Sequence, residues 1–402
     1  MNTMLDASVV EAAEKFDHHS TMFRDHSYEI YDYLRGTSPI HFTDAWDGFW
    51  VLTRYADVMA VARDDVNFSS EFISQPPSPV KTWPIALDPP LSTKMKFLIT
   101  PFFSPKALDE LMSQIKPLST QLVDDVIEKG HCDFTEELGI PQIGIITMRM
   151  AGIDESKTMK IAHLVHPLIY IEGDMTQMAE WQTQLDKFLR DEVEAQVHGE
   201  RKGLIGVLLG SQIDGEPVTP DTVVNIMMLL MFGGLDTTQA VMGSALVHMY
   251  RNPEYRTLFR ERPELRQSMV EEYLRLYAPQ QALFRTCVKP VAVNGHQFNP
   301  GDRVMMSWAA ANRDPAAFDR ADEFVPDREP NRHMAFGVGS HRCLGSSLAR
   351  QEIQVLLEEI VTRMPDYVID ESKLKMAPDI CYVYGYKSVP MTFTPGKRVL
   401  SE

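Results

Sequence analysis

Ten residues near the carboxyl end of the chain, Phe336 to Gly345, place a single cysteine in a tight turn. Glycines stand at positions 337, 339 and 345 around Cys343, and a pattern typical of a helix follows from Ser347. A helix that begins just after the sulfur directs backbone N–H groups towards it, and these stabilise a thiolate. The turn therefore indicates either a cysteine that binds a metal centre or a structural cysteine buried in a glycine-rich turn.

A thiolate held in this way suits haem iron, because a cysteine ligand on haem favours cleavage of the O–O bond. The order Phe-Gly-x-Gly-x-His-x-Cys-x-Gly resembles the haem-binding signature of the cytochrome P-450 family. The resemblance implies that Cys343 is the iron ligand and that His341 faces a haem propionate. It also implies that Phe336, Gly337 and Gly345 belong to the haem-binding turn.

A second motif interrupts the longest predicted helix, which begins after a Thr219 N-cap and ends before Asn252. Near its middle the chain reads Gly-Gly-Leu-Asp-Thr-Thr, residues 233–238. Two glycines inside a helix cost about 1 kcal/mol each relative to alanine, and a buried carboxylate needs a partner. One interpretation is a close helix crossing with Asp236 paired at a surface. The other is a site where a flat ligand approaches the helix.

The run 233–238 resembles the oxygen-activation motif of the cytochrome P-450 family at every position. The resemblance implies that Gly233 lies against haem, that Thr237 acts on the bound oxygen, and that Asp236 relays protons to it through water. Reduction of dioxygen requires such protons in a site that otherwise excludes water. The resemblance also implies the fold of that family, mainly α with a small β part and a long central helix over the haem.

A charged pair three residues apart, Glu272 and Arg275, lies on one face of a predicted helix over 263–277. Taken alone, such a pair is most simply an exposed ion pair. It resembles the Glu-x-x-Arg element of the family, which a Phe-x-Pro-x-Arg segment completes. Residues 324–328 fit that segment, so the resemblance implies that Arg328 joins Glu272 and Arg275 in a structural cluster behind the cysteine loop.

Haem carries two propionates, so we expect cationic groups at its edge. Arg285 matches a position that the family uses for this purpose. Lys96 is a further candidate, although the segment 88–96 departs from the family by having Ser92 and Lys96 where histidine and arginine are common. Lysine supplies a point charge rather than a bidentate fork.

The substrate pocket is expected to have mostly apolar walls, with Trp83, Tyr170 and Tyr384 as polar handles. By position in the chain, the predicted wall residues are Trp83, Ile85, Leu168, Ile169, Tyr170, Leu230, Met231, Gly234, Leu283, Val383 and Tyr384.

Local patterns elsewhere predict a few strands among many helices. Residues 40–43 and 49–52 flank a turn and predict a hairpin, and residues 55–63 have helical spacing. Residues 74–79 are a proline-rich loop, and helices dominate from 104 to 210. Short strands are predicted at 291–293 and 303–306. With no repeat or linker, we expect one domain, residues 1–402.

Composition excludes several classes of protein. There are 39 Lys and Arg against 56 Asp and Glu, a formal net charge of −17, which disfavours binding to nucleic acid or anionic lipid. The four cysteines have no disulfide-like spacing and indicate reduced thiols. The first 19 residues have no apolar stretch, and the apolar run 223–235 is too short to span a bilayer. We expect a monomeric cytoplasmic protein.

The motifs together predict a monooxygenase that inserts one oxygen atom of O₂ into a small hydrophobic substrate, a terpenoid or an aromatic compound. No flavin or nicotinamide segment is visible, so the resemblance implies electrons from a 2Fe–2S ferredoxin and its reductase. Lys94, Lys96, Arg332 and Arg342 are a candidate docking spot for it. The alternatives are a peroxide-driven peroxygenase and a non-catalytic haem-thiolate sensor.

Overall fold

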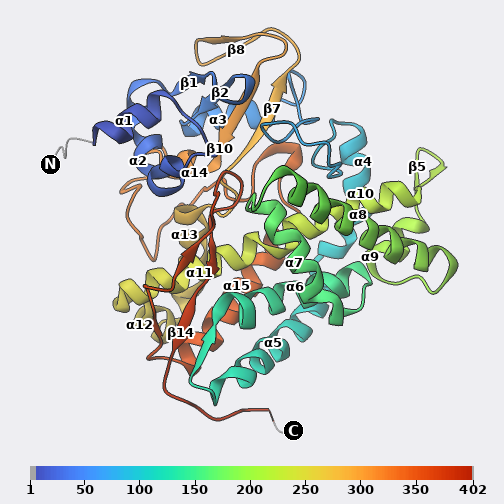
Figure 1. Ribbon diagram of the computed structural model, residues 1–402, viewed down its shortest axis with the longest axis vertical. Helices are drawn as coiled ribbons and strands as arrows, with labels where there is room; N and C mark the ends of the chain where they lie inside the picture. The colour runs from blue at the N-terminus through green and yellow to red at the C-terminus, as the bar shows by residue number, and fades with distance from the viewer. Residues whose placement is uncertain (1–5, 401–402) are drawn as a thin grey trace.

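The computed structural model describes residues 6–400, and helices dominate it (Figure 1). The helices are α1 (Ala7–Glu14), α2 (Thr21–Thr37), α3 (Tyr55–Arg63), α4 (Leu91–Ile99), α5 (Pro105–Ile127), α6 (Ile140–Ala151), α7 (Thr158–Ile169), α8 (Met175–His198), α9 (Gly203–Leu209), α10 (Pro220–Leu235), α11 (Thr237–Arg251), α12 (Pro253–Glu261), α13 (Arg266–Tyr277), α14 (Trp308–Ala311) and α15 (Ser346–Arg363).

The strands form one larger sheet and several small ones. They are β1 (Ile40–Thr43), β2 (Phe49–Leu52), β3 (Phe68–Ser69), β4 (His131–Asp133), β5 (Gln212–Ile213), β6 (Glu216–Pro217), β7 (Ala282–Cys287), β8 (Val291–Val293), β9 (His296–Phe298), β10 (Arg303–Ser307), β11 (Val368–Ile369), β12 (Lys375–Met376), β13 (Tyr386–Ser388) and β14 (Pro390–Thr392). The larger sheet has the order β1-β2-β10-β7-β3, in which only β2 and β10 are parallel. It lies with α1, α2 and α3 at one end of the molecule (Figure 1).

The long predicted helix is present as α10 and α11, which meet at Asp236 and cross the middle of the molecule (Figure 1). Thr219 caps α10, since its hydroxyl accepts a hydrogen bond from the Thr222 N–H at 3.2 Å, and Pro220 occupies the first turn. Residues 220–251 are long and apolar enough to cross a membrane by length and composition, but 67% of the apolar window is buried inside the protein. The pair is therefore a core helix, as its pattern predicts.

Most of the local predictions are confirmed, and two need correction. The hairpin of β1 and β2, helix α3, and strands β8 and β10 lie where the sequence places them. The helix predicted from Pro263 begins at Arg266, because residues 263–265 form a 3₁₀ turn instead. Strand β7, which lies between β10 and β3 in the larger sheet, was not predicted. The alternation of side chains along a strand places its Leu283 and Arg285 on one face.

Candidate active site

The Cys343 turn is fixed by its backbone. The Cys343 N–H donates to the Phe336 carbonyl at 2.9 Å, and α15 begins three residues after the cysteine. Gly339 has a φ of +77°, and a Cβ there would lie 2.8 Å from the Ala62 carbonyl oxygen. Only glycine fits this point, because both the left-handed backbone and the close approach of α3 exclude a side chain.

The sulfur of Cys343 faces a cavity of about 520 Å³. The Cys343 side chain is exposed where it faces the cavity, whereas Cys132, Cys287 and Cys381 are buried and do not line it. Burial raises the pKa of the Cys343 thiol; the Gly345 N–H and the charges of Lys96, Arg342 and Arg350 act in the opposite direction. A coordinating metal deprotonates such a thiol outright.

One face of α10 and α11 forms another wall of the same cavity. Leu230, Gly233, Gly234, Thr237 and Val241 line it, which is the spacing of a single helical face. A Cβ built on Gly233 would meet nothing within 4 Å, so the glycine leaves open space on this wall. The Thr237 hydroxyl donates to the Gly233 carbonyl at 2.9 Å, which loosens the helix at the cavity.

A cationic edge, formed by Arg285 and Lys96, completes the cavity, and the His341 imidazole lies beside these two cations. Burial and Arg303 lower the pKa of Arg285 to about 10, and burial, Arg285 and Lys96 lower the pKa of His341 to about 4. Lys96 donates to the carbonyls of Ser340 and Arg342 at 2.6 and 3.0 Å. Within residues 6–400, neither Arg285 nor Lys96 forms an ion pair with a carboxylate.

These features fit haem. The cavity offers one sulfur ligand, an open glycine wall and, at its edge, the cations Arg285 and Lys96, which have no carboxylate partners within the described residues and suit two propionates. Phe336, Gly337 and Gly345 line the cavity beside the cysteine. Ser92 is 1% exposed and does not line it, so of the two doubtful positions in segment 88–96 only Lys96 is available at this edge.

Asp236 has a different environment from the one its motif suggests. It is fully buried, does not line the cavity, and forms an ion pair with His166 near the end of α7. Asp236 stands between the end of α10 and the start of α11, and its ion pair with His166 directs the carboxylate at α7. Burial acts to lower the pKa of His166, but the Asp236 carboxylate, with Glu136 and Glu172, raises it overall.

The surroundings of this pair contain further buried polar atoms. Tyr170 and Gln239 are buried, and within the described residues the tyrosine oxygen and both amide atoms lack hydrogen bonds that meet standard geometry. A concentration of such groups beside the acid of the motif indicates room for ordered water. Sequence reasoning missed His166, since its partner lies 70 residues further along the chain.

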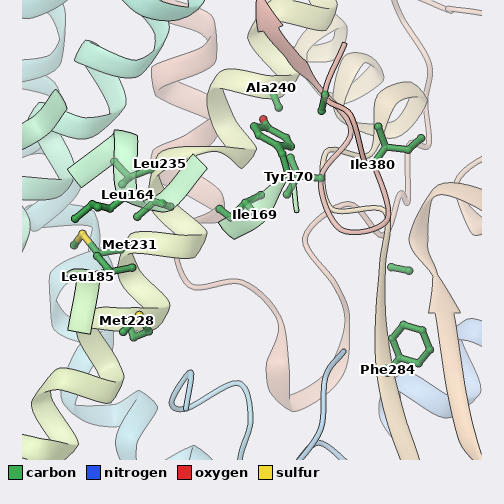
Figure 2. Packing of buried hydrophobic residues seen from close by; sticks show 14 of the residues in the cluster. Leu164, Ile169, Tyr170, Leu185, Met228, Met231, Leu235, Ala240, Phe284 and Ile380 are labelled. Carbon is green, nitrogen blue, oxygen red and sulfur yellow. The ribbon is translucent and has the colours of Figure 1, made fainter. Parts of the chain in front are cut away.

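Most of the predicted pocket residues line the cavity; the lining residues are Trp83, Ile85, Leu168, Ile169, Leu230, Gly234, Leu283 and Val383. Met231, Tyr170 and Tyr384 do not, so their assignment to the wall was wrong. Met231 is fully buried in the cluster that contains Leu164 of α7 and Leu185 of α8, and its side chain packs towards those helices (Figure 2).

The two tyrosines are turned away from the cavity for different reasons. Tyr170 follows the last residue of α7, and its hydroxyl points towards Ala240 and the loop at Gly385 (Figure 2). Tyr384 stacks on Tyr277, with ring centres 6.1 Å apart, at the side of α13. Of the three predicted polar handles, only Trp83 is therefore in the pocket.

The structure brings Glu272, Arg275 and Arg328 together away from solvent. Arg275 donates to both Glu272 oxygens at 2.8 Å, and the Arg328 Nε lies 3.0 Å from Glu272 Oε1. The exposed-pair interpretation is wrong, because Glu272 and Arg275 have no exposed side-chain surface. Arg275 also donates to the carbonyls of Asn312, Ala321 and Glu323, which holds the segment before the cysteine loop.

A neighbouring ion pair ties α13 to the cysteine loop. Glu271 accepts from Arg350 of α15 at 2.8 Å, and the Arg350 guanidinium lies 4.4 Å from the centre of the Phe336 ring. The candidate docking spot is smaller than predicted, since Lys94 is paired with Asp214 at 2.6 Å and Lys96 is held inside. Arg332 and Arg342 are exposed.

Comparison with known proteins agrees with this geometry. Residues 159–373 match the family model described as Cytochrome P-450. Among curated relatives, the steroid C26-monooxygenase of Mycobacterium tuberculosis is 29% identical over 373 residues, which cover 91% of this chain and 93% of the relative. Cytochrome P-450-terp of a Pseudomonas species is 26% identical over 401 residues, 91% of this chain and 93% of that one.

Solved structures share the fold over nearly the whole chain. A mutant of P-450 EryK in complex with erythromycin B superimposes with a TM-score of 0.85 at 25% identity, covering 94% of this chain and 98% of that one. CYP108D1 from Novosphingobium aromaticivorans gives a TM-score of 0.84 at 25% identity, covering 98% and 100%. With the matched family model and the cysteine cavity, these similarities show that the chain belongs to the cytochrome P-450 family of haem-thiolate monooxygenases.

Proposed function

We propose that this P-450 monooxygenase uses Cys343 as its axial haem ligand and oxidises an apolar substrate of steroid or terpenoid size. The single observation that carries the assignment is that Cys343, the open Gly233 face and the cationic edge belong to one cavity. Cys381, near the carboxyl end, is not a candidate, because its thiol is buried beside Asp379 outside the cavity wall.

Haem bound here supplies the activation of dioxygen, and the chain supplies its orientation and its protons. Cys343 would hold the iron, and Arg285, His341 and Lys96 would hold the propionates. The apolar walls exclude bulk water and orient the substrate. Thr237 presents a hydroxyl at the wall of the cavity, while Asp236 holds its carboxylate behind that wall against His166.

His166 can therefore pass a proton directly to its ion-pair partner Asp236. Asp236 precedes Thr237 in the chain, and the Thr237 hydroxyl lies at the wall of the cavity. We infer that His166 and Asp236 supply protons to the Thr237 side through water among the buried polar groups. This arrangement favours the reaction with O₂ and electrons over the peroxide-driven alternative. Hydrogen peroxide already carries the two electrons and two protons that O₂ must receive, so it has less need of a proton relay.

The substrate class follows from the walls and from two similar proteins. Leu168, Ile169, Leu230, Leu283 and Val383 are apolar, and polar groups are few around them. One relative is named a steroid C26-monooxygenase, and the structure of CYP109E1 from Bacillus megaterium, 26% identical with a TM-score of 0.79, contains testosterone. We therefore place steroids and terpenoids first, ahead of small aromatic compounds.

Electrons are proposed to come from a separate 2Fe–2S ferredoxin with its reductase, in a monomeric, cytoplasmic protein whose residues 1–402 form one domain. Arg342 is exposed and also lines the cavity beside Cys343, so it is the best placed docking cation. Arg342→Glu should slow reduction by ferredoxin and leave substrate binding unchanged. Electron-transfer rates that do not depend on salt concentration would contradict this docking site.

The central experiment uses purified holoenzyme and its Cys343→Ser variant, with Cys381→Ser as the matched control. The reduced carbonyl complex of the wild type and of Cys381→Ser should show the red-shifted Soret absorbance of sulfur-bound iron, and Cys343→Ser should lose it. Retention of that absorbance in Cys343→Ser would overturn the ligand assignment.

The substrate proposal is tested by titrating the ferric enzyme with a panel of steroids and terpenoids and by analysing products. A matching compound should displace the iron-bound water, shift the Soret band, and gain one oxygen atom when O₂ and reduced ferredoxin are supplied. Absence of any shift across the panel would discard the substrate class. Turnover with peroxide alone that Thr237→Ala leaves unchanged would favour the peroxygenase.

A further inference from the structure

We propose that His19 is a positioning residue for the substrate cavity: as an imidazolium it clamps the proline-rich loop to the loop at 379–383, and its protonation sets how firmly the cavity is closed. The inference rests on the proposed function, in which that cavity holds the substrate. The clamp itself lies outside the haem site, between segments that are far apart in the chain.

The clamp is centred on one backbone oxygen. The Gln75 carbonyl faces His18 Nε2 at 2.8 Å, His19 Nε2 at 3.0 Å, and the Tyr382 hydroxyl at 3.2 Å. The other ring nitrogen of His19, Nδ1, lies 2.7 Å from Asp379 Oδ2. The amino-terminal segment, the proline-rich loop and the carboxyl-terminal loop therefore meet at this point.

This geometry requires two protons on the His19 ring. A carbonyl oxygen and a carboxylate accept hydrogen bonds but donate none, so both ring nitrogens must carry hydrogen to make both contacts. His19 is accordingly charged when the clamp is complete. A neutral His19 ring has only one N–H donor. The lone pair of its other nitrogen would then face an oxygen that also accepts, and that contact is repulsive.

The groups around His19 favour the charged ring. Burial acts to lower its pKa, but the hydrogen bond to Asp379 and the charge of that carboxylate, with the Gln75 carbonyl and Asp17, raise it above the usual value. The side chains of His19 and Asp379 are only 10% and 11% exposed, so solvent screens the pair weakly.

The other polar groups at the clamp are compatible with this charge. Arg303 donates to Gln75 Oε1 at 3.0 Å and to the Ser74 carbonyl at 2.6 Å, and so holds the same loop from β10. On the carboxyl-terminal loop, the Cys381 N–H donates to Asp379 at 2.7 Å, and burial raises the pKa of the Cys381 thiol, which stays protonated.

His18 provides a built-in contrast. It is 1% exposed, its Nδ1 has no hydrogen-bond partner within the described chain, and burial together with His19 lowers its pKa to about 4. His18 is therefore neutral around neutral pH and donates through Nε2 alone. Of the two histidines on the Gln75 carbonyl, only His19 has a raised pKa.

The clamp controls walls of the cavity. Ser74 and Ser78, on either side of Gln75, line it, as do Tyr382 and Val383 on the other loop. A group whose pKa is higher in the folded than in the unfolded protein stabilises the fold below the unfolded-state pKa. This stabilisation is lost as the pH rises through the folded-state pKa, so the two loops should separate more easily in alkaline solution.

A bound metal is a competing interpretation of the same residues. Ligand atoms of His19, Asp379 and Cys381 lie within 4.8 Å of one another. A metal would need His19 Nδ1 and the Cys381 sulfur without their protons. A metal site therefore predicts that protection of the proline-rich loop from backbone hydrogen exchange rises with pH and with added Zn²⁺. The clamp predicts the reverse dependence on pH and no requirement for metal.

The test measures backbone hydrogen exchange in peptides that cover residues 73–80 of the ferric holoenzyme from about pH 5.5 to about pH 9, corrected for the intrinsic rate. Protection should fall at least roughly tenfold as His19 loses its proton, which is the lower end of the contribution of one hydrogen bond to a charged group. The same transition should appear in the NMR titration of ¹³C-labelled histidine assigned to His19.

Three variants make the result specific. His19→Gln should give low protection with no pH step, His19→Lys should keep protection across the range because lysine stays charged, and His18→Gln should lower protection uniformly while the step remains. A wild-type protein without a step, a step that survives in His19→Gln, or protection that depends on Zn²⁺ would overturn the proposal. None of these readouts uses turnover, so failure of the clamp is distinguishable from failure of the proposed activity.

Discussion

Replacement of Glu271 by glutamine should weaken the support of the cysteine loop in a way that depends on pH. The carboxylate of Glu271 on α13 accepts from Arg350 of α15 at 2.8 Å and faces His333 Nε2 at 2.9 Å. Arg350 in turn lies over Phe336, the first residue of the haem-binding turn. Glutamine keeps the shape of the side chain but removes its charge.

The magnitude follows from the ionisation of Glu271. Burial acts to raise its pKa, but the hydrogen bonds and charges of His333 and Arg350 lower it to about 2, from an ordinary value of 4.5. The difference between these two pKa values corresponds to an upper limit of about 3 kcal/mol. Because the side chain is 20% exposed, water screens part of this, and we expect about 1–3 kcal/mol for Glu271→Gln.

The sign is determined by the direction of the shift. A lowered pKa means that the stabilisation is complete above about pH 4.5 and is lost as the pH falls towards 2. The stability difference between wild type and Glu271→Gln should therefore be largest near pH 7 and should narrow below about pH 4.5.

The assay compares thermal unfolding of the ferric holoenzyme, followed by circular dichroism, at pH 7 and in steps down to about pH 3.5. The matched control is Glu264→Gln, an exposed partner of Arg262, whose replacement should change stability far less because solvent screens exposed ion pairs. Glu271→Gln should also convert more readily to the form whose reduced carbonyl complex lacks the sulfur-bound absorbance. A variant as stable as the control, or a difference that stays constant down to pH 3.5, would refute the reasoning.

Three further outcomes are expected. Arg285→Gln removes a buried cation from the cavity edge and should speed haem transfer to apomyoglobin roughly tenfold. His166→Gln should lower the amount of product formed per electron pair and leave the substrate Kd unchanged. In the wild type, product formed per electron pair should fall as pH rises through the raised pKa of His166. The control is His163→Gln, at an exposed position on the same helix. Leu230→Phe should change the substrate spectral shift, whereas Met231→Leu should not, since only Leu230 lines the cavity; equal effects would contradict the assignment of the wall.

Short motifs in which one backbone conformation carries the chemistry could be predicted well from the sequence. The Cys343 turn depends on glycines at fixed positions, and at Gly339 the positive φ and the nearby Ala62 carbonyl leave no alternative. The central helix was equally predictable, because its capping residues Thr219 and Pro220 and its apolar length are local properties. The fold class follows from such elements, and similarity to solved structures confirms it.

Positions that depend on the direction of a side chain were predicted less well. Met231 and Leu230 are adjacent and both apolar, so composition cannot distinguish the residue that lines the cavity from the one that packs against α7 and α8. The helical period distinguishes them once Gly233 and Thr237 are taken as the cavity face, because Leu230 shares that face and Met231 does not. The sequence itself therefore carries the information that separates Leu230 from Met231.

The ion-pair partners of buried charges could not be predicted from local sequence patterns. Asp236 needs a cationic partner, yet the chain offers 39 Lys and Arg and 12 His, and nothing local identifies His166. The choice is made by the packing of α7 against α10, which brings two residues 70 positions apart into contact and excludes water from the acid. His19 and Asp379, 360 positions apart, are brought together in the same way at the edge of the cavity. In both pairs tertiary packing supplies the counter-charge and raises the histidine pKa, so the pH response of this enzyme is a property of its fold.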